Sequence, residues 1–423
     1  MAIYTIALAA LVSQWLLCTS AAPAGSTESN DDATDSGVGI LDIFIPPVRS
    51  DDLYYNVNVT VNSQVIPVLL DTGSGDLFVA SDECPTNDPA DGCYQLQGAY
   101  EIKPSDNIIP NETFFTIVGE GAVYGNQSLA SVNLGGVSIP DLATGLVYSS
   151  AAKEFQNGSF AGILGLNMAS VSRQVYFNGR DPPFDALAKS SSIAQPKFSV
   201  TLPRMGDPES PKVGRLTIGG IGTELAEDDI KYGPVFATPN YNYEDFPLQF
   251  QGWTIHLEGI RMNGKEVQMN NGSLIPTGEY LSMLDTGGSS MYFRPPELDQ
   301  IASLFNGPTI YQQGHAIYFD CSIPQLLELK YFGQWYPVDP LDLLIPKDHG
   351  NSNGTELCHA ALGSWTRTFG DSIIGVPFLR SAQSVFDYVT LDLKSQPRVG
   401  LVGTVDAEAA MKRYPDIYQD RIL

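Results

Sequence analysis

Two stretches decide the fold, Val68-Leu-Leu-Asp-Thr-Gly-Ser74 and, much later in the chain, Leu281-Ser-Met-Leu-Asp-Thr-Gly-Gly288. In each, an apolar run typical of a buried strand ends in Asp-Thr-Gly. A second pair of segments, Phe160-Ala-Gly-Ile-Leu-Gly-Leu166 and Asp371-Ser-Ile-Ile-Gly-Val-Pro-Phe378, follows its motif at a similar distance and sets two branched apolar residues before a glycine. An internal repeat of this kind predicts two related lobes.

The repeated aspartates are the candidate catalytic residues. Glycine permits the tight turn that holds the preceding side chain at the end of a strand. One Asp-Thr-Gly usually marks only a turn, but two in equivalent positions of a repeat are far more specific, and two-fold pairing would bring Asp71 and Asp285 face to face. Facing carboxyls share a proton, so one can act as base and the other as acid on a water molecule. This chemistry requires no metal and no cofactor.

The remainder of the chain indicates a mostly β protein. Its 423 residues exceed what one compact core usually holds. Short alternating apolar runs at 55–61, 114–118 and 198–202 are separated by Gly, Pro and Asn clusters, as in strands. The best helical segment is 295–305, which starts with proline and is followed by Asn-Gly.

The charge balance excludes one class of partner. The chain carries 48 acidic and 23 basic residues, a formal net charge of −25, which repels phosphate backbones and anionic membranes, so we expect no nucleic-acid partner. The surplus suits an acidic environment, where protonation relieves the self-repulsion. A solubilising surface explains it equally well.

The N-terminus predicts secretion. Residues 1–21 resemble a signal peptide, with an apolar core and small residues at the end. Residues 22–40 are small, polar and acidic, and predict a disordered leader or short propeptide. The charged tail at 406–423 and the absence of a later long apolar run predict no membrane anchor. We expect an extracellular protein, and a vacuole or lysosome-like compartment is the less favoured alternative.

Cysteines and sequons agree with a secretory route. Four cysteines remain after removal of the signal, so we expect two disulfides. Three pairings are open, and the nearest-neighbour one, Cys84 with Cys93 and Cys321 with Cys358, needs no crossing between the halves. Six sequons predict glycosylation, at Asn58, Asn111, Asn126, Asn157, Asn271 and Asn353.

From about Ile40 to Val405 the chain resembles the pepsin-like aspartic proteases, in particular secreted eukaryotic members. The segments that carry the resemblance are LLDTGSGDLFVAS (69–81), GILGL (162–166), KFSVTLPR (197–204), LTIGGI (216–221), MLDTGGSS (283–290), FDCSIP (319–324) and IIGVPFLRSAQSVFD (373–387). The resemblance implies a bilobal β fold, with two pseudo-symmetric lobes at 41–232 and 233–405 and a central cleft. It also implies a monomer that cleaves proteins and peptides between bulky apolar residues at acidic pH, and that binds pepstatin-type inhibitors.

The resemblance also assigns roles to residues beside the aspartates. Thr72 and Thr286 would cross-link the two motif loops by hydrogen bonds, and Ser74 would support the carboxylate of Asp71. The supporting loop residues include Gly73 and Gly287. The flap and substrate cleft would be formed by Val118, Gly119, Glu120, Gly121, Phe78, Phe155, Ile163, Gly288 and Met291.

Three positions depart from the family pattern. Val118 stands where the flap usually carries Tyr, and Phe78 replaces the Trp that usually hydrogen-bonds that Tyr. Gly288 stands where Thr or Ser would support the second aspartate. These changes keep one alternative open, a catalytically impaired pepsin-fold binding or inhibitor protein. Retention of both Asp-Thr-Gly motifs favours the endopeptidase.

Overall fold

The structure is a computed structural model that describes residues 37–49, 51–119, 121–238, 249–312, 316–352, 354–366 and 370–422, apart from the side chains of residues 154, 157 and 351. All of these belong to one compact unit, Asp35–Leu423. The predicted signal peptide and most of the predicted leader lie outside the described residues, as do Glu120 and Asn353. Strands predominate, as the sequence predicts.

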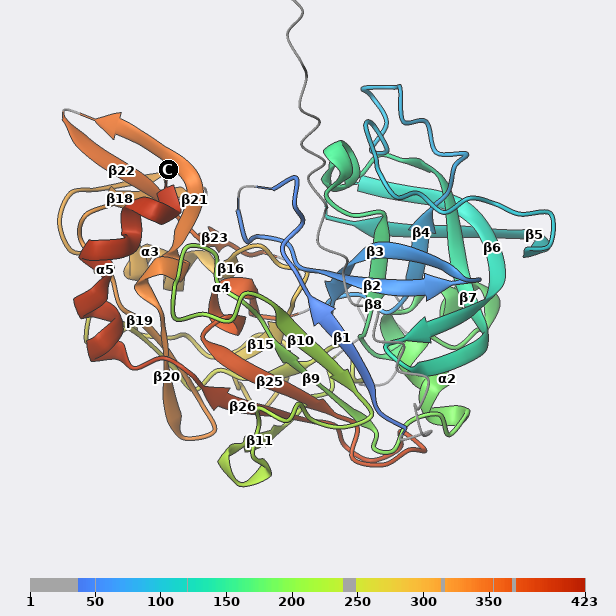
Figure 1. The fold of residues 1–423 in the computed structure, drawn as a ribbon. Coiled ribbons are helices and arrows are strands. Elements are labelled where there is room, and N and C mark those ends of the chain that lie inside the picture. The colour runs from blue at the N-terminus through green and yellow to red at the C-terminus, as the bar shows by residue number, and fades with distance from the viewer. Residues whose placement is uncertain are drawn as a thin grey trace, which may run out of the picture. The chain divides into compact units, whose positions relative to one another are not determined.

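A seven-stranded sheet contains the first Asp-Thr-Gly motif (Figure 1), in the order β2-β3-β8-β4-β7-β6-β5. Its strands are β2 (Asn56–Val61), β3 (Gln64–Asp71), β4 (Leu77–Ala80), β5 (Asn107–Val118), β6 (Gly121–Leu134), β7 (Val137–Ser150) and β8 (Gly162–Gly165). In β2, Val57 and Val59 are fully buried while Asn58 between them is exposed, the alternation of a half-covered strand. β3 instead ends in a continuous buried run that leads into Asp71.

The second motif directly follows β15, a strand of a five-stranded sheet of order β12-β15-β24-β16-β23. Its strands are β12 (Thr254–His256), β15 (Leu281–Leu284), β16 (Met291–Phe293), β23 (Leu362–Ser364) and β24 (Ser372–Ile374). Two four-stranded sheets complete this half of the chain. They contain β13 (Gly259–Met262), β14 (Lys265–Glu266), β19 (Leu327–Tyr331) and β20 (Gln334–Val338), and β17 (Thr309–Gln312), β18 (Ala316–Asp320), β21 (Leu344–Ser352) and β22 (Thr355–Ala360).

The two motifs occupy equivalent places in their sheets. β3 pairs in parallel with β8, which sets Asp71 opposite Gly165. β15 pairs in parallel with β24, which sets Leu284, the residue before Asp285, opposite Ile374. After each motif the next strand returns antiparallel to the same partner, β4 on β8 and β16 on β24. The repeat seen in the sequence is therefore confirmed as a repeat of strand topology.

A six-stranded sheet joins the halves, in the order β1-β10-β9-β25-β26-β11 (Figure 1). Its strands are β1 (Gly39–Ile43), β9 (Lys197–Thr201), β10 (Gly214–Ile218), β11 (Lys231–Pro234), β25 (Ala382–Asp387) and β26 (Arg398–Gly403). The halves meet where β9 pairs with β25, and there Phe198 lies opposite Phe386. The predicted lobe boundary, between residues 232 and 233, falls within β11.

Four of the five described α-helices are short and lie between strands, and the longer α5 follows the last strand. The α-helices are α1 (Arg173–Asn178), α2 (Pro183–Lys189), α3 (Pro295–Ser303), α4 (Val376–Leu379) and α5 (Ala407–Ile422), and the 3₁₀ turns are η1 (Lys153–Gly158), η2 (Ala169–Val171), η3 (Glu227–Asp229) and η4 (Pro340–Leu343). The helix predicted over 295–305 is therefore present and two residues shorter. Among the described residues, no helix combines the length and apolarity that a membrane span requires.

The segment predicted as a charged tail folds into α5 and docks through buried ion pairs. Both carboxylate oxygens of Asp52, in the first half, accept from Arg421 at 2.8 and 2.9 Å. Arg413 pairs with Asp207 at 2.7 Å and also contacts Asp339. The charged side chains at the C-terminus therefore attach the helix to both halves of the chain.

Candidate active site

Each Asp-Thr-Gly motif turns back on its own aspartate. We call residues 71–74 and 285–288 the aspartate loops. The Gly73 N–H donates to Asp71 Oδ1 at 2.7 Å, and the Gly287 N–H donates to Asp285 Oδ1 at 2.8 Å. Asp71 is buried, with 8 % of its surface exposed, and Asp285 is partly buried. The two carboxyls are thus held by matching backbone donors.

The two glycines lie against the opposite carboxyl. A Cβ atom on Gly73 would lie 2.6 Å from Asp285 Oδ1, and one on Gly287 would lie 2.5 Å from Asp71 Oδ1. Both separations are far below van der Waals contact, so a larger residue at either position would displace the opposite carboxyl. The reciprocal contacts place the two carboxyls face to face, as the repeat predicts.

The two threonines lock the aspartate loops together. Thr72 N–H donates to Thr286 Oγ1 at 3.0 Å, and Thr286 N–H donates to Thr72 Oγ1 at 3.0 Å. Each hydroxyl then donates across the junction, from Thr72 to the Leu284 carbonyl at 3.0 Å and from Thr286 to the Leu70 carbonyl at 2.8 Å. Both threonines are fully buried. The cross-links that the family resemblance implied are therefore present in this chain.

The electrostatics of the pair are unequal. Burial raises the pKa of Asp285 well above its usual range, and the charge of Asp71 and a hydrogen bond between the two carboxyls raise it further. The N–H groups of Gly287 and Gly288 oppose this rise. On the other side, the Ser74 hydroxyl donates to Asp71 Oδ2 at 2.5 Å, whereas Gly288 offers Asp285 no hydroxyl. The site can therefore hold one proton between its two carboxyls, on Asp285.

The two carboxyls face each other on matching loops of two related lobes. This arrangement points to one protein family. The model of the family described as eukaryotic aspartyl protease matches residues 53–396. The chain belongs to that family. This aspartyl protease is an endopeptidase, a hydrolase of peptide bonds, with the mostly β, bilobal fold of its family.

Curated relatives agree with this assignment. A probable aspartic-type endopeptidase of Aspergillus fumigatus is 23 % identical over 80 % of this chain and 77 % of the relative. Napsin-A of Homo sapiens is 28 % identical over 85 % of this chain and 79 % of the relative, and cathepsin E-B of Xenopus laevis is 26 % identical over 85 % and 82 %. The similarity therefore spans most of the aspartyl protease and most of each relative.

The predicted flap is the hairpin of β5 and β6. Its last pair is Val118 with Gly121, and Gly119 has a φ of +49° that suits the turn. Glu120, also assigned to the flap, lies outside the described residues. A Cβ atom on Gly121 would lie 2.2 Å from the backbone nitrogen of Ala152, so the hairpin end packs tightly against the chain after β7. Val118 is partly buried against the core.

Phe78 lies in a buried apolar cluster with two other phenylalanines. Phe78 is 1 % exposed, and its ring centroid lies 5.4 Å from that of Phe114 and 5.9 Å from that of Phe155. Tyr124, six residues beyond Val118, is 44 % exposed and its ring lies 5.3 Å from that of Phe115. Because Tyr124 pairs with Phe115 and Val118 pairs with Gly121, the alternation of side chains sets Tyr124 on the opposite face of the hairpin from Val118.

The other residues assigned to the cleft lie in different environments. Phe155 in η1 and Ile163 in β8 are 2 % and 3 % exposed, and Met291 in β16 has no exposed surface. Gly288 is partly buried, beside Asp285. Their contacts with substrate stay a prediction.

One supporting residue was missed in the sequence. Asp76, two residues after the first aspartate loop, is buried and accepts from the Ser172 hydroxyl at 2.5 Å and from the Arg173 N–H at 2.8 Å. It thereby ties the start of α1 to the segment that follows Ser74. Burial raises the pKa of Asp76 despite these donors. The available signal in the sequence was an acidic residue directly before the apolar run Leu77-Phe-Val-Ala80.

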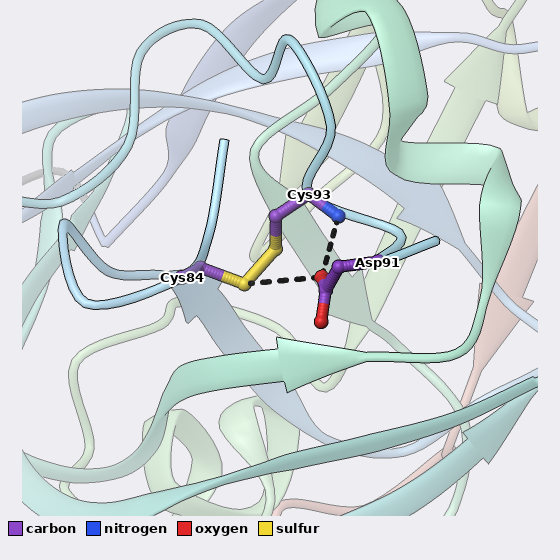
Figure 2. A group of neighbouring side chains, drawn as sticks. All are labelled: Cys84, Asp91 and Cys93. Atoms are coloured by element: carbon purple, nitrogen blue, oxygen red, sulfur yellow. Dashed lines mark hydrogen bonds between the residues drawn. A yellow bond between two sulfur atoms is a disulfide. The ribbon is translucent and has the colours of Figure 1, made fainter. Parts of the chain in front are cut away.

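Both disulfides form the nearest-neighbour pairing, Cys84 with Cys93 and Cys321 with Cys358. Figure 2 shows Asp91 beside the first, where its Oδ1 accepts from the Cys93 N–H at 2.8 Å. This trio has the residue types of a metal site, but a disulfide leaves no thiolate to bind an ion. Asp91 therefore has a structural role, as a backbone acceptor.

Among the predicted glycosylation sites, Asn58, Asn111 and Asn271 are exposed and Asn126 is partly buried. The side chain of Asn157 and all of Asn353 lie outside the described residues. Occupancy of all six sequons stays a prediction.

Proposed function

We propose that this protein is a secreted aspartic endopeptidase in which Asp71 and Asp285 activate a water molecule to cleave internal peptide bonds at acidic pH. The reciprocal packing of the two carboxyls on the opposite glycines carries this proposal. Family membership supports peptide hydrolysis in general, and the aspartates are the titratable pair that fits that chemistry.

The inequality of the pair suggests their roles. Asp285, with its raised pKa, holds the proton and donates it to the substrate carbonyl oxygen. Asp71 acts as the ionised base that takes a proton from the water as its oxygen attacks the carbonyl carbon. The tetrahedral intermediate then collapses: the proton on Asp71 moves to the peptide nitrogen, the C–N bond breaks, and a hydroxyl proton returns to Asp285. One water is consumed, and a carboxylic acid and an amine are released.

The pH range follows from the same pair. Activity requires one protonated and one ionised carboxyl. When both carboxyls are protonated the pair has no base, and when both are ionised it has no acid. The raised pKa of Asp285 keeps the one-proton form populated over acidic pH. The acidic composition of the chain suits that environment.

Other features support the proposed preference for apolar substrate residues and the proposed secretion of the protein. Val118, a partly buried apolar side chain, ends strand β5 of the proposed flap, which favours bulky apolar residues beside the scissile bond. The signal-like N-terminus, two disulfides and six sequons favour secretion and glycosylation. We further propose a monomer that binds pepstatin-type inhibitors.

Hydrolysis of an acid-denatured protein tests the function. The purified protein should cleave such a substrate at pH 3–5, with cleavage sites between apolar residues, and pepstatin should abolish cleavage while EDTA does not. A folded protein that binds pepstatin without cleaving any peptide in a diverse library would instead support the impaired binding protein.

A further inference from the structure

Trp253 connects the two aspartate loops by a route that involves neither threonine. It lies immediately before β12 and has no exposed surface. Its indole N–H donates to the Leu166 carbonyl at 3.0 Å, and the Leu166 N–H donates to the Asp71 carbonyl at 2.8 Å. One side chain of the second half therefore reaches the backbone of the first aspartate through a single intermediate residue.

The backbone of the same tryptophan binds the residue that precedes the other aspartate loop. The Leu284 N–H donates to the Trp253 carbonyl at 3.1 Å, and Leu284 directly precedes Asp285. A continuous path of hydrogen bonds thus runs from Asp71 through Leu166 and Trp253 to Leu284, which is covalently bonded to Asp285. Because the indole N–H is the only donor of a tryptophan side chain, the path depends on that one group.

The ring of Trp253 is fixed by the sheet that joins the halves. Its centroid lies 5.7 Å from that of Phe198 on β9, 5.1 Å from that of Phe386 on β25 and 4.9 Å from that of Tyr388. β9 and β25 are the strands at which the halves pair. The indole is therefore held against the structural junction of the molecule while its N–H points to the segment that supports Asp71.

The equivalent residue of the first half lacks this link. Tyr55 lies immediately before β2, and its carbonyl accepts from the Leu70 N–H at 2.9 Å, as the Trp253 carbonyl does from Leu284. Its hydroxyl, however, donates to the Pro203 carbonyl at 2.6 Å, and Pro203 belongs to neither aspartate loop. Of the two related aromatic residues, only Trp253 links both loops.

We propose that Trp253 is a positioning residue that sets the relation between the Asp71 and Asp285 carboxyls through Leu166 and Leu284. This inference rests on the proposed function of the aspartates as the catalytic pair. The threonines belong to the loops and bind them directly to each other. Trp253 lies outside the loops and packs against the sheet that joins the two halves. Loss of the indole N–H would leave the buried Leu166 carbonyl without its side-chain donor and allow the first loop to shift relative to the second.

The test compares two ways of perturbing one aromatic cluster. Trp253→Phe keeps an aromatic ring but removes the N–H, and Phe386→Leu loosens the same cluster without touching the hydrogen-bond path. We expect Trp253→Phe to lower kcat about 10-fold with KM changed less than about 2-fold, and to shift the limbs of the pH–rate profile, because it moves the reacting groups and not the substrate pocket. Phe386→Leu should leave both properties near wild type at temperatures well below its Tm.

Replacement of Trp253 by benzothienylalanine, which keeps the shape of indole but has sulfur in place of N–H, covers the case in which Trp253→Phe fails to fold. It should reproduce the fall in kcat and the shifted limbs. If the Trp253 and Phe386 variants each lose kcat in proportion to their loss of Tm, Trp253 acts only through packing. That result would overturn the proposal.

Titration of the two carboxyls by NMR keeps this inference separate from the proposed function. With ¹³C-labelled aspartate, the coupled titration of Asp71 and Asp285 can be followed without turnover. An inactive wild type would contradict the proposed function, yet Trp253→Phe should still change that titration while Phe386→Leu does not. Superimposable titrations of wild type and Trp253→Phe would overturn the positioning role even in an active enzyme.

Discussion

Thr72 and Thr286 are bound to each other twice, since the N–H of each donates to the hydroxyl of the other at 3.0 Å. Each hydroxyl therefore accepts one bond and donates another, to the carbonyl of Leu284 or of Leu70. No water is needed to satisfy these buried groups. The four hydrogen bonds of this cross-link consequently depend on two side-chain oxygens.

Removal of either hydroxyl should destabilise the fold and impair catalysis together. Thr72→Val or Thr286→Val keeps the side-chain shape but leaves a buried N–H and a buried carbonyl without partners, which should cost about 2–4 kcal/mol in the free energy of unfolding and at least about 10-fold in kcat. Urea unfolding and initial rates measure the two effects. Thr→Ser at either position retains the oxygen, and a serine variant as impaired as the valine variant would show that the hydrogen bonds are not the cause.

A hydroxyl at position 288 should make Asp285 easier to ionise. A Cβ atom there would lie 3.4 Å from Asp285 Oδ2, so the hydroxyl of Gly288→Ser can donate to that oxygen and favour its charged form. Burial and Asp71 raise the pKa of Asp285 in the wild type, and the alkaline limb of the kcat/KM profile should therefore move to lower pH in the serine variant. Gly288→Ala, which adds the Cβ atom alone, is the control, and equal profiles for the two variants would contradict the prediction.

The flap substitutions should act as a pair. Val118→Tyr alone adds a hydroxyl for which the ring of Phe78 offers no hydrogen-bonding partner, so pepstatin affinity should stay the same or fall. Adding Phe78→Trp supplies an indole N–H, and the double variant should recover affinity with a coupling of roughly 0.5–1.5 kcal/mol. Calorimetric affinities of the four proteins provide the cycle. Strictly additive effects would mean that the two positions are independent.

Stability should fall between acidic and neutral pH because of Asp185. This carboxyl, 8 % exposed in α2, has its pKa raised to about 6 by burial, and its Oδ1 has no hydrogen-bond partner among the described residues. Because the folded-state pKa exceeds the unfolded value of 3.8, the stabilisation from its bound proton is complete below that value and is lost as pH rises through 6. Asp185→Asn should remove about 2–3 kcal/mol of the difference between pH 4 and pH 7 in urea unfolding.

Ion pairs around α5 act in the opposite direction. The guanidinium groups of Arg380 and Arg421 overcome burial and lower the pKa of Asp52, so its contribution is present above the unfolded pKa and is lost only as pH falls below it. The dependence of the free energy of unfolding on pH that we attribute to Asp185 should therefore be measured above pH 4. An unchanged slope in Asp185→Asn over that window would refute the assignment.

The sequence predicted those features that depend on local pattern and internal repetition. Two Asp-Thr-Gly motifs behind apolar runs were sufficient to expect facing carboxyls, because equivalent segments of a repeat occupy equivalent places in related sheets. Of the three disulfide pairings that the sequence left open, the structure contains the one between nearest neighbours, Cys84 with Cys93 and Cys321 with Cys358.

Features that depend on distant partners were missed. In the sequence, Arg421 is only one charge of a predicted tail. Its partner, Asp52, lies near the other end of the chain and is close to it only in the folded structure. Trp253 reads as an ordinary core residue because its acceptor, Leu166, is reached only through tertiary structure. Asp76 accepts from the first backbone N–H of α1, a helix that starts almost a hundred residues later. Spacing along the chain carries no signal for such contacts.

The turnover of Asp71→Asn and Asp285→Asn tests the central claim most directly. Asparagine keeps the size of each side chain and much of its hydrogen bonding, but neither variant can share a proton between two carboxyls. Each purified variant should retain the wild-type fold by circular dichroism and lose at least about 10³-fold in kcat on an acid-denatured protein at the pH optimum. Turnover within about 10-fold of wild type by either variant, free of contaminating protease, would contradict catalysis by the aspartate pair.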